Sequence, residues 1–297
     1  MQSTGVLVHH YSLEKWQNIF PRAQNFNIVS RDFEPQWKLL PNIKCLRLAH
    51  VRIAPESFAD FISIKSLEIV DCSGFDGNSL RHLSSINSLA IPRLLSFGDA
   101  DIENLTTLET FKMGGCWQKE MTGAAFQSLP NITSLDISYC GQTSLFEFLH
   151  HLKRLKTLIM EGCYHIEQYF LNDLPDLTTL NLRECEQVTD DWFPQLSTLT
   201  NLDISGCKQI TDHAFVHVQQ LRVLNISNCG LFMSSDFVIP LTNLISVRLF
   251  KCSGMHASLR NPSSPLRTLQ RTGCCLYYEF EDVDGQPAAK VEEEVEE

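Results

Sequence analysis

The feature that most constrains this chain of 297 residues is a set of cysteines at nearly constant spacing. Nine of the eleven cysteines stand three residues after a position that recurs every 20 to 24 residues. Eleven of these twelve recurring positions are apolar, and the last is Arg271. The positions are Ile28, Leu48, Ile69, Ile91, Met113, Ile137, Met160, Leu182, Ile204, Ile226, Leu249 and Arg271. The cysteines are Cys72, Cys116, Cys140, Cys163, Cys185, Cys207, Cys229, Cys252 and Cys274. The spacing predicts a protein built from repeats.

Each repeat carries the same local pattern, in which apolar residues precede the cysteine at fixed offsets. Examples are ITSLDISYC at 132–140, LTTLNLREC at 177–185 and LTNLDISGC at 199–207. The alternation predicts a short strand with every second side chain pointing inward. One repeat cannot bury its apolar side alone, so successive strands must stack. A period near 22 with this core is typical of leucine-rich repeats.

The predicted fold class is therefore an α/β solenoid, a leucine-rich-repeat horseshoe of about twelve repeats. A curved parallel sheet should form the concave face, with short helices or turns on the convex face. In 188–196 and 210–218, Thr and Asp precede apolar pairs at helical spacing, which predicts a helix N-cap. We expect an N-terminal cap at 1–22, the solenoid at 23–278 and an acidic disordered tail at 279–297. Within the cap, Trp16, Ile19 and Phe20 should cover the first end of the core.

The cysteines are expected to be structural thiols. They occupy the same internal position of successive repeats, and only Cys274 and Cys275 are close in sequence. A thiol is small, usually buried and able to form weak hydrogen bonds, which suits a turn after a strand. Zinc would need short, clustered Cys or His spacings that the chain lacks. We therefore predict no metal, no cofactor and a reducing compartment, either cytoplasm or nucleus.

The charge of the chain is −11, and its acidic residues are concentrated at the C-terminus. Residues 279–297 contain nine acidic side chains against Lys290 alone. Such a segment is expected to be disordered and to serve either as a solubilising end or as a dock for a basic partner. An acidic chain argues against nucleic-acid binding. No apolar stretch reaches the roughly 20 residues of a membrane helix, and the N-terminus has no signal-peptide pattern.

Catalytic motifs are missing from the sequence. There is no phosphate-binding glycine loop, no HExxH, no GxSxG and no set of kinase motifs. We therefore expect a monomeric binding protein and not an enzyme.

Two repeats carry a resemblance to a known family. CEQVTDDWF at 185–193 and CKQITDHAF at 207–215 resemble the cysteine-containing leucine-rich repeats of F-box proteins, the substrate receptors of cullin-based ubiquitin ligases. The resemblance implies that the repeats hold a protein client while a separate F-box binds the ligase adaptor. Only about two dozen residues precede Ile28, and they contain no recognisable F-box. Two functions stay open: client recognition with ubiquitin-ligase components as partners, or a scaffold or regulatory adaptor unrelated to ubiquitin.

The predicted client would contact the concave face. Its contact residues should be outward side chains near the recurring apolar positions, where most residues are small. The larger ones are candidate anchors, because aromatic and Arg side chains dominate interface energetics. They are Tyr139, Glu161, Arg183, Glu184, Arg248, Phe250 and Lys251. Glu184 could instead pair with Arg183. Pro92 cannot donate a ladder hydrogen bond, so its repeat is predicted to be kinked or bulged.

Overall fold

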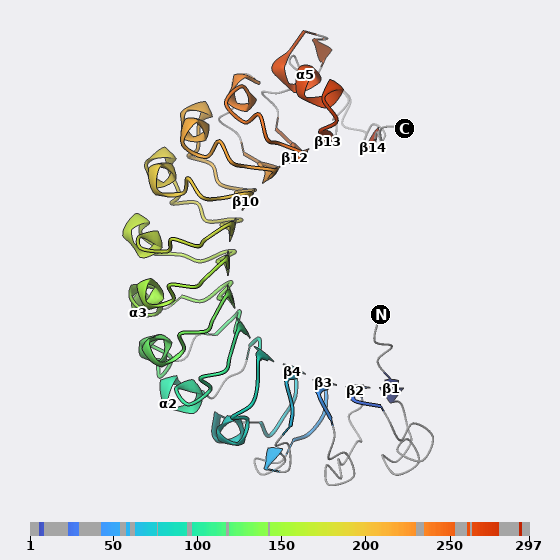
Figure 1. Ribbon diagram of the computed structural model, residues 1–297, viewed down its shortest axis with the longest axis vertical. Helices are drawn as coiled ribbons and strands as arrows, with labels where there is room; N and C mark the ends of the chain where they lie inside the picture. The colour runs from blue at the N-terminus through green and yellow to red at the C-terminus, as the bar shows by residue number, and fades with distance from the viewer. Residues whose placement is uncertain are drawn as a thin grey trace. The chain divides into compact units, whose positions relative to one another are not determined.

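The computed structural model describes most of the repeat region. The described residues are 6–8, 23–29, 43–53, 58–59, 63–75, 77–93, 97–116, 119–141, 143–229, 235–252, 260–261, 263–278 and 291–292. The chain divides into two compact units, called here the N-terminal unit (Met1–Leu155) and the C-terminal unit (Lys156–Glu297). Each unit is a stack of short strands on one side and short helices on the other (Figure 1). No helix among the described residues is long and apolar enough to cross a membrane.

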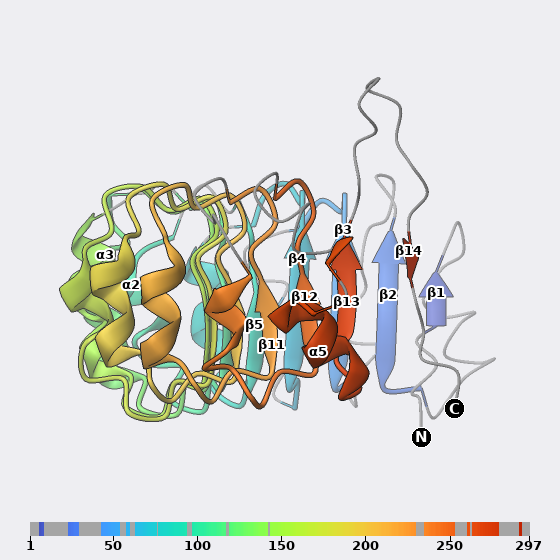
Figure 2. The ribbon, with the colours of Figure 1, turned by 90° about the horizontal axis from the view of Figure 1, so that it is seen from above.

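The N-terminal unit contains strands that each pair in parallel with the next along the chain. The strands are β1 (Val6–Val8), β2 (Asn25–Val29), β3 (Cys45–Ala49), β4 (Ser66–Val70), β5 (Ser88–Ala90), β6 (Thr110–Lys112) and β7 (Ser134–Asp136). The helices are η3 (Gly77–His82), α2 (Asp99–Ile102), η4 (Ala124–Ser128), α3 (Thr143–Glu147) and η5 (Leu149–His151), where η denotes a 3₁₀ helix. Strands β2, β3 and β4 point the same way in Figure 2.

The C-terminal unit repeats the arrangement with greater regularity. Its parallel strands are β8 (Thr157–Ile159), β9 (Thr179–Asn181), β10 (Asn201–Asp203), β11 (Val223–Asn225), β12 (Ser246–Arg248) and β13 (Cys275–Tyr278). A last strand, β14 (Val291–Glu292), pairs antiparallel with β13. The helices are η6 (Gln168–Leu171), η7 (Asp190–Gln195), η8 (Asp212–His217), η9 (Asp236–Val238) and α5 (Pro265–Arg271).

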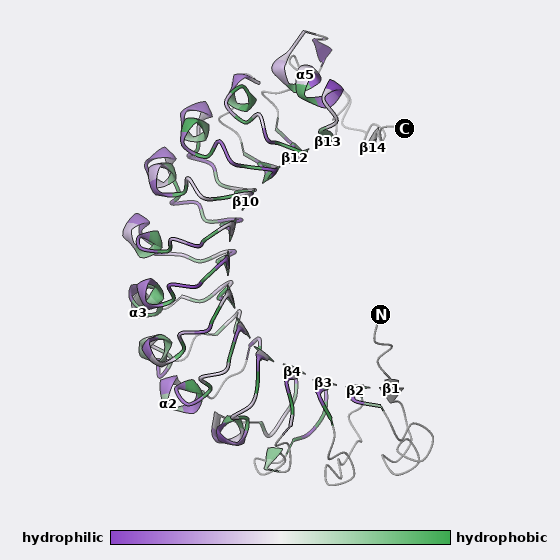
Figure 3. Cartoon of the chain, viewed as in Figure 1, coloured by the Kyte–Doolittle hydropathy of each residue, from purple (hydrophilic) through white to green (hydrophobic). Residues whose placement is uncertain are grey.

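The core runs between the strands and the short helices. In β10, for example, Leu202 is buried and its two neighbours in the strand are half-buried. Ile204, one step further, is also buried and points to the same side. On the helical side, hydrophobic residues face the strands (Figure 3). These features confirm the predicted fold class, a leucine-rich-repeat solenoid.

The short helices are fastened to one another by side chains as well as by the core. The Asp190 carboxylate accepts hydrogen bonds from Thr211 of the next repeat, at 2.8 Å from its N–H and 2.5 Å from its hydroxyl. Thr211 in turn caps η8 by accepting the N–H of His213 at 3.3 Å. In the N-terminal unit, Asp99 binds Thr122 in the same way. The predicted Thr cap is thus confirmed for η8, and an Asp from the repeat before holds it.

The last repeat differs from its prediction. Arg271 is the final residue of α5, and it does not occupy the core position assigned to it. Because Val247 pairs with Leu276, the position equivalent to Leu249 belongs to the buried residue Tyr278. Cys274 therefore lies before its strand and is not part of the cysteine series. The prediction of a core slot at Arg271 was wrong because α5 adds residues that shift the register.

The prediction of a kink at Pro92 was also wrong. β5 pairs with β4 and with β6 without interruption of register. Pro92 lies two residues after Ala90, in the turn beyond the strand, so no ladder hydrogen bond needs its nitrogen. The residues on either side of Pro92 keep the backbone hydrogen bonds to the next repeat. The N–H of Ile91 donates to the carbonyl of Lys112, and the N–H of Arg93 donates to the carbonyl of Gly114. The repeat accommodates the proline because Pro92 lies at a turn position whose nitrogen donates no ladder hydrogen bond.

The predicted ends of the chain lie mostly outside the described residues. Within the expected cap at 1–22, only β1 is described, and Trp16, Ile19 and Phe20 are not. Within the expected tail at 279–297, only β14 is described. Val291 pairs there with Tyr278, and Glu292 pairs with Tyr277. The expectation of a disordered tail stays a prediction.

Candidate binding surface

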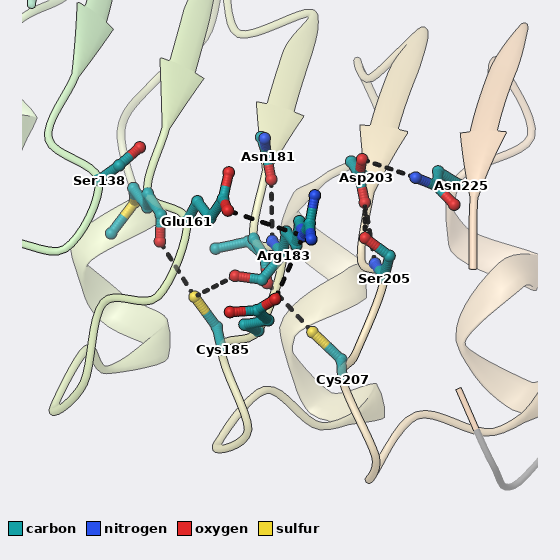
Figure 4. Close-up of polar contacts among 12 residues, drawn as sticks. Ser138, Glu161, Asn181, Arg183, Cys185, Asp203, Ser205, Cys207 and Asn225 are labelled. Atoms are coloured by element: carbon teal, nitrogen blue, oxygen red, sulfur yellow. Dashed lines mark hydrogen bonds and ion pairs between the residues drawn. The ribbon is translucent and has the colours of Figure 1, made fainter. Parts of the chain in front are cut away.

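The cysteines form a series of buried thiols at the ends of the strands. In the C-terminal unit, the Sγ atoms of Cys185, Cys207, Cys229 and Cys252 lie 3.0–3.1 Å from the backbone carbonyls of the residues at the recurring apolar position one repeat earlier. Figure 4 shows two of these bonds. Each thiol thus ties the turn of its own repeat to the preceding one, as the expectation of structural thiols required. All eleven cysteines are free.

Burial makes these thiols poor nucleophiles. It raises the pKa of Cys185 and Cys229 to about 12 and that of Cys252 to about 11, from an ordinary value of 9.0. The thiolate is the reactive form of cysteine, and a raised pKa keeps it scarce at neutral pH. In the described ranges, no group of three or more His, Cys, Asp or Glu side chains could hold a metal ion. The thiols serve the fold.

A second series of polar contacts closes four of the turns on the outward side of the strands, those after β7, β9, β10 and β11. In these repeats the Asp or Asn between the two buried apolar positions accepts the N–H of the residue two further on. Asp203 Oδ1 accepts from Ser205 N at 2.9 Å and from its hydroxyl at 2.6 Å, and Asn181 Oδ1 accepts from Arg183 N at 2.8 Å. Asn225 also donates to Asp203 across the strands at 2.8 Å (Figure 4). This contact is an Asx turn, in which the side chain replaces a backbone acceptor.

The residue before each cysteine position has a left-handed backbone. Glycine fills it in some repeats, such as Gly206 at φ 80°. Other repeats keep a full side chain there, at φ between 49° and 60°: His50, Asp71, Arg93, Tyr139, Glu184, Asn228 and Lys251. A side chain in this conformation is strained by about 1 kcal/mol or more. Three predicted anchors, Tyr139, Glu184 and Lys251, therefore lie on the turn after their strands and not at the outward strand positions where they were expected.

The predicted anchors in the middle of the C-terminal unit contact one another. Arg183 Nε lies 3.6 Å from Glu161 and 3.3 Å from Glu184 (Figure 4). The two carboxylates, Glu161 foremost, raise the pKa of Arg183. Asp203 and Asn225 on the adjacent strands are joined as described above. This part of the strand side satisfies its charges internally, so the role of these three residues in binding stays a prediction.

The anchors near the end of the C-terminal unit are also held by neighbours. The Arg248 guanidinium lies over the Tyr277 ring, 5.6 Å from its centroid, a cation–π geometry. Phe250 is half-buried, and its N–H donates to Ser227 Oγ at 3.2 Å. Lys251 is exposed on its turn. Their proposed contact with a client also stays a prediction.

The strand side of the N-terminal unit contains a feature that the sequence analysis missed, a hollow of about 700 Å³. It extends over β4 to β7 and over the turns after β5, β6 and β7. Ala90 and Pro92 form part of its lining, and Arg93, Lys112 and Tyr139 stand around it. Only Tyr139 was among the predicted anchors. A signal was present in the sequence: the β5 repeat has Ala90 in place of the Asx residue and Leu94 in place of the cysteine.

Small residues create this hollow. Ala90 stands in register with Lys112 on one side and Glu68 on the other, so a methyl group separates two long side chains. Ala90 cannot accept a turn hydrogen bond, and Pro92 has no N–H that would require one. The pair is therefore compatible with the turn without any polar side chain. Gly114 adds no side chain to the neighbouring turn, where a Cβ would lie 3.2 Å from Ser138 O.

Comparisons with known proteins agree with the fold. No protein-family model matches the sequence, and no curated protein sequence matches it. Among solved structures, an internalin from Listeria monocytogenes superposes with a TM-score of 0.58 at 18% identity, covering 75% of this chain and 65% of that chain. TLR13, in a complex with ssRNA13, gives 0.60 at 19% identity, covering 76% of this chain and 36% of that one.

Toll, in the Toll–Spatzle complex from Drosophila, gives a TM-score of 0.56 at 16% identity, with coverage of 77% and 37%. This chain spans less than two thirds of the length of each of the three proteins. At these identities the likeness concerns the fold. It supports the leucine-rich-repeat architecture, and the resemblance to F-box proteins has no counterpart among these three.

Proposed function

We propose that this chain is a non-catalytic protein-binding module that uses the strand side of its repeats. The observation that carries the proposal is the division of labour within each repeat. Apolar residues, thiols and Asx contacts build the core and turns, whereas the outward strand positions carry small polar residues that leave the face accessible. Ser66, Ser88, Thr110 and Ser134 form such a row across β4 to β7. This row of small side chains leaves room for a partner's backbone and side chains.

The neighbouring folds support the same idea at a coarse level. Two of the solved structures are complexes, of Toll with Spatzle and of TLR13 with an RNA. The present proposal favours a protein partner, because the chain carries a net charge of −11. Its eleven free cysteines favour a reducing compartment, the cytoplasm or nucleus.

The test blocks one side of the molecule at a time. A partner is first identified by affinity purification of the full chain and confirmed with purified proteins. Ser88→Arg or Thr110→Arg then places a bulky side chain on the strand side, and Val216→Arg, at a 52% exposed position of η8, serves as the matched control on the helical side. We expect the strand-side variants to weaken binding on the order of 10-fold, equal to about 1.4 kcal/mol. Loss of binding with Val216→Arg and not with the others would overturn the proposal.

The repeat-level resemblance to F-box proteins supports a finer proposal, that the partner is a client for ubiquitin-dependent degradation. This reading predicts that a cullin adaptor is recovered with the partner, and that proteasome inhibition raises the partner's level. The alternative, a scaffold or regulatory adaptor, predicts a stoichiometric partner whose level does not respond to the inhibitor. Recovery of stable partners without any ligase component would refute the ubiquitin proposal. The proposal of a protein-binding module would stand.

A further inference from the structure

We propose that the hollow of the N-terminal unit binds an acidic segment of the partner protein, with a carboxylate of that segment between Arg93 and Lys112. The inference rests on the proposed function and adds the location and chemistry of the contact. The hollow, of about 700 Å³, is lined by both cations, by the hydroxyl-bearing Ser138 and Tyr139, and by the apolar surfaces of Ala90 and Pro92.

The two cations are available, which is the first argument for an acidic partner. Arg93 and Lys112 are both exposed, and neither forms an ion pair with any described residue. Lys112 stands directly opposite Asp136 in the sheet register, yet the two do not pair. The reason is that Asp136 Oδ1 is turned towards Ser138, from which it accepts the N–H at 3.0 Å and the hydroxyl at 2.7 Å.

The carboxylates around the hollow are engaged by the protein itself, which is the second argument. Glu68 accepts a hydrogen bond from Arg47 Nε at 3.1 Å, and Arg47 also donates to Asn27 at 3.2 Å. The hollow therefore holds two cations without an ion-pair partner among the described residues, while one oxygen of each of its two carboxylates is engaged. A carboxylate of a partner would supply the ion-pair partner that Arg93 and Lys112 lack, and a basic segment would be repelled by these two cations.

The geometry of the turns keeps one cation in place, which is the third argument. Arg93 has a left-handed backbone at φ 58° and sits at the strand end, beside the hollow. Gly115 follows in the equivalent position of the next repeat, and a Cβ added to it would lie 3.0 Å from Arg93 Cγ. The glycine thus leaves space for the Arg93 side chain to lie over the neighbouring turn. The net charge of the chain does not oppose the contact, because charges beyond about 8 Å are largely screened at physiological salt.

In the described part of the C-terminal unit, the outward cations near the strand ends have other surroundings. Arg183 is paired with Glu161 and Glu184, and Arg248 lies over the Tyr277 ring. Lys251, at the position equivalent to Arg93, is exposed and forms no ion pair with any described residue. Lys208 is paired with Glu186 at 2.8 Å. Unused cations and a hollow coincide in the β5 to β7 repeats, where the repeat pattern is interrupted. This coincidence locates the acidic-segment contact there.

The test uses the full chain labelled with ¹⁵N and a synthetic peptide of alternating Glu and Gly as probe. Peptides in which Gln or Lys replaces Glu are the matched probes. We expect the Glu peptide alone to shift the amide resonances of Gly114 and Gly115, while Gly206 in the C-terminal unit stays unchanged. Lys112→Gln or Arg93→Gln should weaken binding on the order of 10-fold. Lys112→Arg should retain binding, and Lys208→Gln, with the same loss of charge elsewhere, should have no effect.

Three results would overturn the inference. They are equal shifts with the Glu and Gln peptides, binding unchanged in Lys112→Gln and Arg93→Gln, and shifts at the hollow that depend on protein concentration without peptide, which would indicate a second copy as occupant. The natural partner then separates this inference from the proposed function. A partner blocked by Ser88→Arg but insensitive to Lys112→Gln would refute the acidic-segment contact and leave strand-side binding intact.

Discussion

The two units of this chain are built from the same type of repeat. They differ in how many of their turns are held by thiol-to-carbonyl and Asx contacts. In the C-terminal unit, the thiols of Cys185, Cys207, Cys229 and Cys252 reach the preceding carbonyl at 3.0–3.1 Å. Asx contacts close the turns after β9, β10 and β11. In the N-terminal unit, Cys140 makes the equivalent contact at 3.7 Å and Cys72 bonds within its own turn. The β5 repeat has neither a cysteine nor an Asx residue.

This difference shows that the same outward strand position can either close the turn of its repeat or leave space for a partner. Where Asp or Asn occupies the outward strand position, its acceptors are used by the turn, and the surface is internally satisfied. Where Ala90 and Pro92 replace that contact, the turn no longer needs a side chain, and space and unpaired cations remain. The regular repeats contribute stability, and the irregular ones contribute the candidate site.

The largest effect expected is alkaline unfolding of the C-terminal unit. Its buried thiols have a folded-state pKa of about 12 for Cys185 and Cys229 and about 11 for Cys252, against 9.0 ordinarily. Because the unfolded chain releases these protons at lower pH, the stability they supply is complete below pH 9. It is lost as pH rises towards 12, by about 1.4 kcal/mol per pH unit and thiol. Urea unfolding monitored between pH 8 and 11 measures the loss.

The control for this prediction is a variant with Cys185→Ala and Cys229→Ala. It should be less stable at neutral pH, because two thiol-to-carbonyl contacts are gone, but its stability should fall less steeply with alkali. A free energy of unfolding that stays constant from pH 9 to 11 in the unaltered chain would show that the thiols are not buried as described.

A buried charge should next separate a regular repeat from the less regular repeat of Cys72. Cys207→Asp places a carboxylate where the thiol is fully buried, and we expect a loss of about 3–5 kcal/mol. Cys72→Asp, at a half-buried position in the N-terminal unit, should cost about 1 kcal/mol or less. Chemical denaturation of both variants gives the comparison. Equal losses would contradict the difference in burial between these two thiols.

Removal of an Asx contact should have an intermediate effect. Asp203→Ala leaves the buried Ser205 without its acceptor and Asn225 without its cross-strand partner, so we expect a loss of about 1–2 kcal/mol. The converse change, Ala90→Asp with Pro92→Ser, installs the contact in the β5 repeat. It should alter stability by less than about 1 kcal/mol, because the new hydrogen bond offsets the lost rigidity of proline. A large loss in the converse variant would mean that the β5 turn differs from its neighbours.

The smallest effect concerns the left-handed turn position. Lys251→Gly should increase the free energy of unfolding by up to about 1 kcal/mol, because glycine adopts φ near 56° without strain. Thermal unfolding measures the gain, and Gly206→Ala, at φ 80°, is the opposite control that should destabilise. A loss of stability in Lys251→Gly would indicate that the lysine side chain has a structural partner.

The fold could be predicted from the sequence because the same apolar pattern occurs in many successive repeats. Ile137, Leu182 and Ile204 follow one spacing, and the structure buries all three. The prediction of a core position failed at Arg271, where a local insertion shifted the register. A fixed repeat length does not predict the additional helix α5. Prediction also failed at Pro92, because the sequence does not show on which side of the strand end the proline falls.

The candidate site was harder to predict than the fold. Large outward side chains were chosen as anchors, but the structure pairs Arg183 with Glu161 and Glu184, and it places Arg248 over Tyr277. The hollow is defined by what its residues lack: a long side chain at Ala90, an N–H at Pro92 and an ion-pair partner at Lys112 in the described structure. Such absences become visible only when the neighbouring strands are placed beside each other.

The measurement that tests the central claim most directly is an amide hydrogen-exchange footprint of the full chain with its partner bound. Because the open repeats are assigned to binding and the closed ones to stability, protection should increase at 88–93, 110–115 and 134–139. Segments 201–206 and 223–228 should exchange as in the free protein. Protection confined to the regular repeats of the C-terminal unit would contradict the account.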